Sequence, residues 1–299
     1  MKLLSFRLHG EERFGPKVKK EEAVWDVLAI QQQLNVLPEF PAKLIDGVSQ
    51  GMEFVEQIRK LTEAAVQSET PEQFKHSFSE IEWQAPVPRP PKNFICIGKN
   101  YADHAEEMGG QAPADMVVFT KAPNTVAADE EKVSAHADVT DSYDYEGELA
   151  VVIGKAGHKI PKQLAYDHVF GYTIALDLTA RDLQEKHQQY FLGKSLPGSC
   201  PMGPYLVTKD EIPQSQNLSL VTKVNDEVRQ NGNTENMIRR VDELIAEISK
   251  SVALEPGDVI LTGTPAGVGK GFNPPKFLKA GDTIKVSIQS IGTLVTHLS

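Results

Sequence analysis

Eight short runs with the composition of β-strands follow one another between residues 93 and 288, and they constrain the fold more than any other feature. They read NFICIG, MVVFTK, ELAVVIG, FGYTIALDLT, PYLVT, LSLVTKVN, DVILTGTP and TIKVSI, and Gly, Pro, Asp and Asn separate them. Runs of this length and spacing indicate a β-rich barrel or sandwich with a few helices, rather than a doubly wound sheet. We therefore predict a β-rich α+β fold, with a hairpin in VTKVNDEVRQNG that turns at Asn225 and Asp226.

A proline cluster divides the chain. Residues 85–94 read APVPRPPKNF, which continues neither a helix nor a central strand. Before the cluster, EEAVWDVLAIQQQL and KLIDGVSQGMEFVEQIRKLTEAAV have helical periodicity and carry no chemical motif. In the first of these segments, Val24, Leu28 and Ile30 are spaced for one helix face. We predict a small N-terminal domain over residues 1–85 and a larger domain over residues 86–299.

The charge balance excludes several classes of function. Asp and Glu number 41 against 31 Lys and Arg, which gives a net charge of −10, and the basic residues are scattered. A nucleic-acid-binding protein needs a basic surface instead. No segment approaches the roughly 18 consecutive apolar residues of a membrane span, and the opening MKLLSFRLHGEER does not have the pattern of a secretory signal. We expect a cytoplasmic protein without a nucleic-acid or membrane partner.

The two cysteines, Cys96 and Cys200, lie more than a hundred positions apart and form no CxxC pair. We expect both to be buried as small hydrophobic residues, without a disulfide or a thiolate metal site.

The stretch DYEGELAVVI, residues 144–153, combines a buried-strand pattern with carboxylates. In an extended chain Glu146 and Glu148 share one face, roughly 6.5 to 7 Å apart, so both could reach one cation. In GYTIALDLTARDLQ, Asp177 lies on the polar face of another strand pattern, among apolar neighbours. Burial of an unpaired carboxylate there is costly, and a divalent cation offsets that cost.

A site made of carboxylates alone favours a hard ion such as Mg²⁺, Mn²⁺ or Ca²⁺. The alternative for Glu146 and Glu148 is a solvated strand face. Spacing by itself does not show that the two segments meet.

Two further segments carry weaker signals. In KNYADHAEEMG, His104 and Glu107 share a face of a helical turn, so the carboxylate could orient the imidazole as a general base; the alternative is an ordinary surface pair. Lys194 in FLGKSLPGSCPMGP is placed to bind a substrate carboxylate or a developing oxyanion; the alternative is a solvated loop lysine.

The glycine-rich TGTPAGVGKG is not a nucleotide-binding loop. Gly271 follows Lys270 where a P-loop has Ser or Thr, and Thr264 stands where its first glycine belongs. The backbone N–H groups of Gly263 and Thr264 could still hold an anionic substrate group, the alternative being a tight turn between strands.

The segments GKNYADHAEEMG, DYEGELAVVIGK, FGYTIALDLTARDLQ, GKSLPGSCPMGP, VNDEVRQNG and LTGTPAGVGKG occur in an order that resembles the fumarylacetoacetate hydrolase (FAH) superfamily, over about residues 90–299. Residues 1–85 resemble the small N-terminal α/β domain of some bacterial members. The resemblance implies a mixed β-roll catalytic domain that forms a homodimer. It also implies a set of site residues: Mg²⁺ or Mn²⁺ on Glu146, Glu148 and Asp177, a His104–Glu107 dyad, and substrate contacts by Lys194, Gln184, Thr264 and Arg181, the last of which could equally form a structural ion pair.

The expected chemistry is divalent-metal-dependent cleavage of a C–C bond in a small 2-oxo acid or 1,3-diketo acid. Two substrate oxygens would chelate the metal, which stabilises the enolate left when the bond breaks. Acylpyruvate or fumarylpyruvate hydrolysis needs a water activated by His104, whereas oxaloacetate decarboxylation does not. Isomerisation of a 2-hydroxymuconate-type diacid is the alternative enzyme activity, and a non-catalytic dicarboxylate-binding protein is the alternative outside catalysis.

Overall fold

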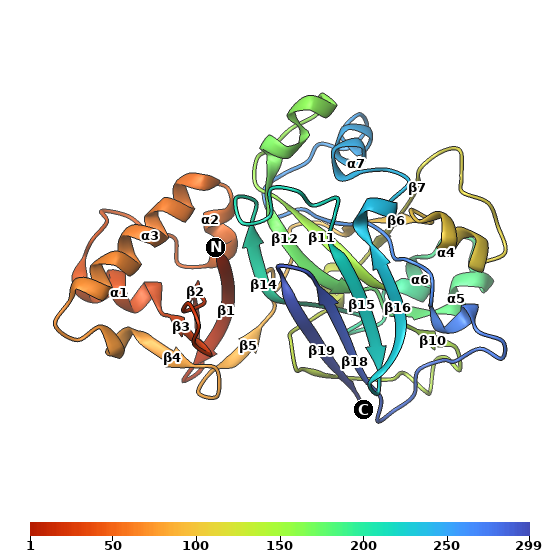
Figure 1. The fold of residues 1–299 in the computed structure, drawn as a ribbon, viewed down its shortest axis with the longest axis horizontal. Helices are drawn as coiled ribbons and strands as arrows, with labels where there is room; N and C mark the ends of the chain where they lie inside the picture. Colours follow the sequence, from red (N-terminus) through yellow and green to blue (C-terminus); the bar gives the residue numbers. More distant parts are fainter.

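The computed structural model describes residues 1–299 as a small N-terminal part beside a larger, strand-rich body (Figure 1). A ten-stranded sheet runs in the order β2-β1-β14-β12-β11-β17-β6-β7, with β5 paired to β1 and β8 paired to β14. Its strands are β1 Lys2–Leu8, β2 Glu11–Pro16, β5 Glu82–Gln84, β6 Phe94–Gly98, β7 Val117–Lys121, β8 Val126–Ala127, β11 Gly147–Ile153, β12 Val169–Leu176, β14 Cys200–Thr208 and β17 Val259–Leu261.

A second sheet of five strands packs against the first, in the order β16-β15-β18-β19-β9. Its strands are β9 Lys132–Val133, β15 Ser219–Val224, β16 Glu227–Asn233, β18 Thr283–Ile288 and β19 Gly292–Leu298. Two small pairs complete the strands: β3 Ala23–Trp25 with β4 Lys75–Ser77, and β10 Tyr143–Asp144 with β13 Thr179–Ala180. The eight predicted runs all contain strands, so the β-rich α+β class is confirmed.

The α-helices are short except for one in the N-terminal part. They are α1 Val27–Leu34, α2 Leu44–Val48, α3 Met52–Gln67, α4 Ala102–Glu107, α5 Arg181–Lys186, α6 Phe191–Lys194 and α7 Val241–Ile248. Five 3₁₀ segments are η1 Pro71–Phe74, η2 Pro123–Thr125, η3 Lys162–His168, η4 Thr234–Asn236 and η5 Gly269–Gly271. No helix is both long enough and apolar enough to cross a membrane.

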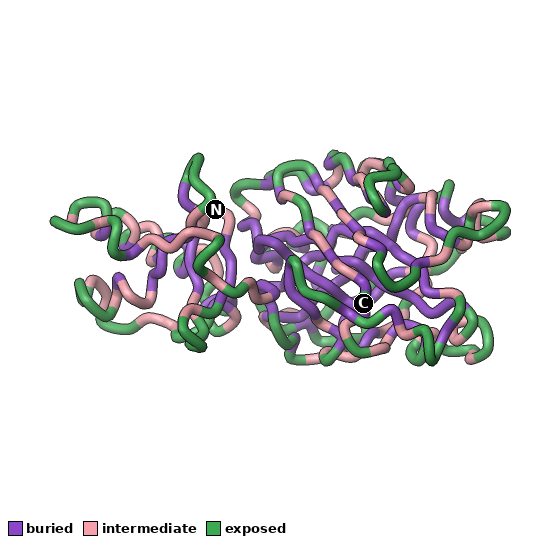
Figure 2. The backbone as a smooth tube through the Cα atoms, turned by 90° about the horizontal axis from the view of Figure 1, so that it is seen from below, coloured by how far each residue is buried: buried purple, intermediate pink, exposed green.

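Strand β11 occupies the middle of the large sheet, between β12 and β17, and all seven of its residues are buried. Its side chains alternate between two cores, as the pleat of a strand requires. Leu149 and Val151 belong to the core shared with the second sheet, whereas Ala150 and Val152 belong to the core that contains α1 and α3. Figure 2 shows this buried interior of the strand-rich body. A strand covered on both faces explains the continuous apolar run LAVVI.

The predicted hairpin is confirmed. Strands β15 and β16 pair in antiparallel register, with Val224 opposite Glu227. Asn225 and Asp226 form the turn, with φ angles of 50° and 67°, in the left-handed region that a tight two-residue turn requires.

The N-terminal helical segments differ from the prediction. The first helix begins only at Val27, because Asp26 caps it by accepting hydrogen bonds from the N–H groups of Leu28 and Ala29. Val24 therefore lies in β3 rather than on a helix face. The second segment is divided into α2 and α3, with Gly51 at φ 62° immediately before α3. A residue in that conformation does not continue a right-handed helix.

The proline cluster contains no helix or strand between β5 and β6. The sheet nevertheless crosses this boundary, because β1 pairs with β14 through Lys2 opposite Val207 and Leu3 opposite Leu206. The division into residues 1–85 and 86–299 stays a prediction. Cys96 and Cys200 are buried and free, as predicted.

One buried carboxylate gives the fold a defined pH dependence. Asp129 lies between β8 and β9 and accepts a hydrogen bond of 2.7 Å from the N–H of Val295 in β19. Burial raises the pKa of this carboxyl from 3.8 to about 6, although the hydrogen bond from Val295 acts in the opposite direction. The folded protein thus retains a proton that the unfolded chain has already lost. Asp129 therefore lowers the free energy of unfolding progressively as the pH rises from about 4 to about 6.

We expect Asp129→Asn to remove this pH-dependent cost. Relative to the wild type, the free energy of unfolding of the variant should increase by up to about 3 kcal/mol between pH 4 and pH 7. Urea denaturation at intervals of one pH unit measures the difference, and Asp138→Asn, at an exposed position, is the control. A difference between variant and wild type that does not change with pH would contradict the assignment.

Candidate functional site

Three buried carboxylates meet where β11 and β12 pair. Glu146 immediately precedes β11, Glu148 is its second residue, and Asp177 immediately follows β12. Gly147 lies opposite Leu176, and the N–H of Asp177 donates a 2.8 Å hydrogen bond to the carbonyl of Glu146. One carboxylate oxygen of each side chain lies within 4.8 Å of the others. The strand register thus converts two distant sequence segments into one cluster.

Three cations surround this cluster. Lys194, in α6, places Nζ 2.8 Å from both Glu146 Oε2 and Asp177 Oδ2. Lys121, at the end of β7, lies 2.8 Å from Asp177 Oδ1. Arg181, at the start of α5, lies 2.7 Å from Glu146 Oε1. Two of the three carboxylates are therefore compensated by protein charges.

Glu148 has no cationic partner. Its carboxylate accepts one hydrogen bond, of 2.7 Å, from the backbone N–H of Gly263. Burial, together with the charges of Asp177 and Glu146, raises the pKa of Glu148 well above its usual range. For Glu146, burial acts in the same direction, but the charges of Lys194 and Arg181 outweigh it and lower the pKa.

This arrangement fits a bound cation. Three close carboxylates offer only hard oxygen donors, and Glu148 has a charge that no side chain neutralises. A divalent ion would supply the missing positive charge and would favour ionised Glu148. No His or Cys belongs to the cluster, so Mg²⁺, Mn²⁺ or Ca²⁺ suits it better than Zn²⁺ or copper.

Arg181 is held by a second buried carboxylate, Asp144, through a 2.8 Å contact from Nε to Oδ2. Asp144 also accepts hydrogen bonds from the N–H groups of Tyr145, Gly269 and Lys270. It thereby links the arginine to the glycine-rich loop. We assigned Asp144 no role from the sequence, although it stands at the start of the acidic stretch that contains Glu146 and Glu148.

The His104–Glu107 dyad forms on α4. His104 Nδ1 lies 3.3 Å from Glu107 Oε2, and the other oxygen of Glu107 accepts a 2.8 Å hydrogen bond from the N–H of Gly267. Both side chains are largely buried, which excludes an ordinary solvated surface pair. The glycine-rich loop therefore positions the carboxylate, and the carboxylate positions the imidazole.

His104 of the dyad and the carboxylates Glu146 and Glu148 line one cavity of about 330 Å³, at the end of the body where α4, α5 and α6 gather (Figure 1). Its lining includes the predicted residues His104, Glu146, Glu148, Arg181, Gln184, Lys194 and Thr264. Gln184 accepts a 3.1 Å hydrogen bond from Arg181. The structure therefore brings the carboxylates, the dyad and these side chains of the predicted substrate site together.

Two predicted substrate contacts are already engaged within the protein. The N–H of Gly263 donates to Glu148, and Gly263 does not line the cavity. The hydroxyl of Thr264 donates to the carbonyl of Gly147 and accepts from Gln230. Substrate contact by either residue stays a prediction, but the geometry gives both a structural role in holding the strand that carries Glu148.

Sequence reasoning missed Lys121 and Lys99. Lys121 is completely buried at the end of the apolar run MVVFTK, and its only carboxylate partner is Asp177. A lysine at the end of an apolar run indicates a buried ammonium group, which requires an anionic partner because burial of an unpaired charge is costly. Lys99 lines the same cavity as His104 and forms no ion pair, whereas the other lysines of the lining, Lys194 and Lys270, are both paired. Its place within the GKNYADHAEEMG motif was the available signal.

The whole chain is similar in sequence to known proteins, and most of it matches one family model. Residues 93–299 match the family model for the C-terminal domain of fumarylacetoacetate (FAA) hydrolase. An uncharacterized protein of Staphylococcus haemolyticus is 50% identical over 301 residues, covering 100% of this chain and 99% of that protein.

Three solved enzyme structures cover 100% of this chain. A fumarylacetoacetate hydrolase from Exiguobacterium antarcticum is 38% identical, with a TM-score of 0.82 and 99% of its own chain covered. A maleylpyruvate hydrolase from Sphingobium sp. SYK-6 is 26% identical (TM-score 0.75, 99% covered). A 5-carboxymethyl-2-hydroxymuconate delta-isomerase from Mycobacterium smegmatis is 29% identical (TM-score 0.72, 98% covered). The predicted fold is confirmed, and the chain belongs to the fumarylacetoacetate hydrolase family.

Proposed function

We propose that this protein cleaves a C–C bond in a small 2-oxo acid or 1,3-diketo acid, with a divalent metal ion as cofactor. The observation that carries the proposal is that Glu146 and Glu148, which form a carboxylate cluster with Asp177, line the same small cavity as His104, which Glu107 holds. A cluster of hard donors beside an oriented imidazole is the arrangement that hydrolysis next to an enolisable group requires.

Glu146, Glu148 and Asp177 would hold Mg²⁺ or Mn²⁺, which supplies Lewis-acid stabilisation of charge on substrate oxygens. Lys194 and Arg181 lie at the same cluster, where their fixed positive charges stabilise the substrate carboxylate and the developing oxyanion. Both are held by carboxylates before substrate arrives, so little reorganisation is needed.

His104 acts as the general base in hydrolysis. Glu107 engages Nδ1, which leaves Nε2 as the nitrogen that accepts a proton from water. The oxygen of that water attacks the distal carbonyl carbon, and the C–C bond then breaks. Its electron pair passes to the pyruvate fragment as an enolate, which takes up a proton to give pyruvate. Loss of CO₂ from oxaloacetate leaves the same enolate without a hydrolytic water.

Lys99 indicates the charge of the preferred substrate. Lys99 has no carboxylate partner, whereas Lys270, another lysine that lines the cavity, pairs with Glu185. An ammonium without a partner favours a substrate that carries a second carboxylate at its far end. This favours oxaloacetate or a fumarylpyruvate-type acid over neutral-ended acetylpyruvate.

Isomerisation of a 2-hydroxymuconate-type diacid is the second candidate. The solved isomerase from Mycobacterium smegmatis supports it, and an oriented His104 could also move a proton between substrate carbons. A non-catalytic dicarboxylate-binding role does not explain an imidazole that Glu107 holds in the cavity lined by Glu146 and Glu148. The homodimer stays a prediction.

The decisive assay is pyruvate release from chelator-treated protein supplied with oxaloacetate, fumarylpyruvate or acetylpyruvate. Mg²⁺ or Mn²⁺ is added back, and the rate with metal alone is subtracted. Metal-dependent release supports C–C cleavage, and the preferred substrate separates hydrolase from decarboxylase. Absence of release from all three substrates, with metal binding intact, would contradict the proposal and favour the isomerase.

We expect Glu148→Gln to weaken Mn²⁺ binding by about 100-fold or more, because it removes the uncompensated charge of the cluster while retaining the side-chain shape. Titration calorimetry on chelator-treated protein measures the affinity. Glu185→Gln removes an exposed carboxylate at the margin of the same cavity and should bind Mn²⁺ as the wild type does. If Glu148→Gln bound Mn²⁺ as tightly as Glu185→Gln and the wild type do, Glu148 would not be a metal ligand.

We expect His104→Ala to slow acylpyruvate hydrolysis by about 10²- to 10⁴-fold, the usual contribution of a general base. Decarboxylation of oxaloacetate should decline much less, because that reaction needs no activated water. His158→Ala, at an exposed position, controls for loss of an imidazole. An unchanged hydrolysis rate in His104→Ala would remove this residue from the mechanism.

We expect Lys99→Met to lower kcat/KM for the dicarboxylates about 10- to 100-fold, mainly through KM, because a charged hydrogen bond contributes about 1.5 to 3 kcal/mol. Activity on acetylpyruvate should change little, and Lys99→Arg should retain the preference for a dicarboxylate. An equal loss on both kinds of substrate would show that Lys99 does not bind the distal carboxylate.

A further inference from the structure

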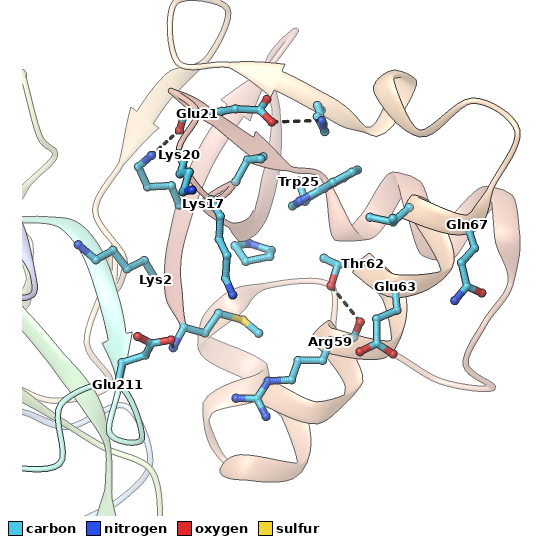
Figure 3. Close-up of a pocket in the computed structure, with 16 residues that line it drawn as sticks. Lys2, Lys17, Lys20, Glu21, Trp25, Arg59, Thr62, Glu63, Gln67 and Glu211 are labelled. Atoms are coloured by element: carbon cyan, nitrogen blue, oxygen red, sulfur yellow. Dashed lines mark hydrogen bonds and ion pairs between the residues drawn. The ribbon is translucent and has the colours of Figure 1, made fainter.

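A second, larger cavity lies far from the candidate active site, in the N-terminal part. Its volume is about 940 Å³, and its walls are the segment between β2 and β3, helix α3 and the edge of the main sheet (Figure 3). Figure 3 shows Arg59, Thr62, Glu63 and Gln67 on the helix, and Lys17, Lys20 and Glu21 on the segment between β2 and β3. It also shows Trp25 in β3, Lys2 at the start of β1 and Glu211 after β14.

The cavity is basic in an acidic protein. Six lysine and arginine side chains line it against three glutamates, whereas the whole chain has a net charge of −10. The six are Lys2, Lys17, Lys19, Lys20, Arg59 and Lys75. A local reversal of the overall charge is an electrostatic feature that attracts anions.

Four of these cations have no carboxylate partner. Lys75 pairs with Glu21 and Glu72, and Arg59 pairs with Glu56 and Asp210. No ion pair is formed by the remaining four, Lys2, Lys17, Lys19 and Lys20. Two of the glutamates that line the cavity pair with other groups, Glu21 with Lys75 and Glu211 with the N-terminal ammonium.

Two of the four are partly buried next to each other. The N–H of Lys17, the residue after β2, donates a 2.8 Å hydrogen bond to the carbonyl of Lys2 at the start of β1. The ammonium group of Lys2 donates to the carbonyl of Ile291 and lies over the ring of Tyr205, and that of Lys17 donates to the carbonyl of Glu21 and lies over the ring of Phe78. Neither ammonium group has a carboxylate partner. Burial and the charge of Lys17 both lower the pKa of Lys2. No ion pair offsets this desolvation and repulsion, so the positive charge beside the cavity is uncompensated.

We propose that this cavity binds a small polyanion that carries phosphate groups, held by Lys17, Lys19 and Lys20. Lysine binds phosphate as a compact point charge, and several ammonium groups on flexible stems can surround several phosphates. The apolar surfaces of Trp25, Val18 and Val66 also line the cavity, and they would contact an organic group attached to the phosphates. The volume is at the upper end of the range for small-molecule sites.

The test is calorimetric titration of the untagged, full-length protein with tripolyphosphate, ATP and citrate. Chelator and low salt keep the anions free of metal. We expect saturable binding of tripolyphosphate and ATP that weakens with added salt, and weaker binding of citrate. Tighter binding of ATP would indicate an organic phosphate, and tighter binding of tripolyphosphate an inorganic one; both results support the proposal. Absence of saturable binding, or citrate binding as tightly as tripolyphosphate, would overturn it.

The double variant Lys17→Gln/Lys20→Gln locates the site. We expect its affinity for tripolyphosphate to fall about tenfold or more, because two ammonium contacts are lost. Lys60→Gln is the matched control, since Lys60 is an exposed lysine of α3 that does not line the cavity. Without added anion, the double variant should retain wild-type kcat/KM, which separates this site from the proposed catalytic one. Equal affinity in the double variant and the wild type would overturn the proposal.

Discussion

The antiparallel pairing of β11 with β12 is the constraint on which the candidate site depends. With Gly147 opposite Leu176, Glu146 and Asp177 meet at the end of the strand pair, and Glu148 faces the same cluster. A slip of one residue would turn each β11 side chain to the opposite face of the sheet. The two hydrophobic cores prevent such a slip, because Leu149 and Ala150 already face different environments of different size.

Carboxylates at this depth require compensation, which the surrounding segments provide. The cations belong to three different elements: Lys121 to β7, Lys194 to α6 and Arg181 to α5. Each lies within 2.8 Å of a carboxylate of the cluster. Removal of one partner from a buried ion pair is strongly destabilising, so these contacts hold the segments around the cavity as well as its charges. Glu148 remains without a cation, and this incomplete compensation is what suits the cluster to a divalent ion. The same groups thus maintain the structure and prepare the proposed chemistry.

Local patterns predicted much of this arrangement. The apolar runs located the strands, Asn225 and Asp226 located the hairpin turn, and the spacing of Glu146 and Glu148 placed both on one face. Prediction was weaker where a single residue redirects the backbone. The capping of α1 by Asp26 moved Val24 into a strand, and Gly51 divided the second helical segment.

Partners that are distant in sequence were the main omission. Lys121 lies 56 residues before Asp177, and Asp144 lies 37 residues before Arg181. Neither separation has a periodicity that sequence analysis can use. The engagement of the Gly263 amide by Glu148 spans 115 residues and was missed for the same reason.

The sequence by itself determined the strand-rich class, the hairpin turn and the types of side chain that the site contains, because these follow from nearest-neighbour sterics and short-range periodicity. Only the tertiary structure decided which charges meet: it joined Asp177 to Glu146, supplied Lys121, left Glu148 and Lys99 uncompensated, and closed a basic cavity beside β1. The physical reason is that burial and electrostatic compensation depend on distances in space, which the register of long-range strand pairs sets.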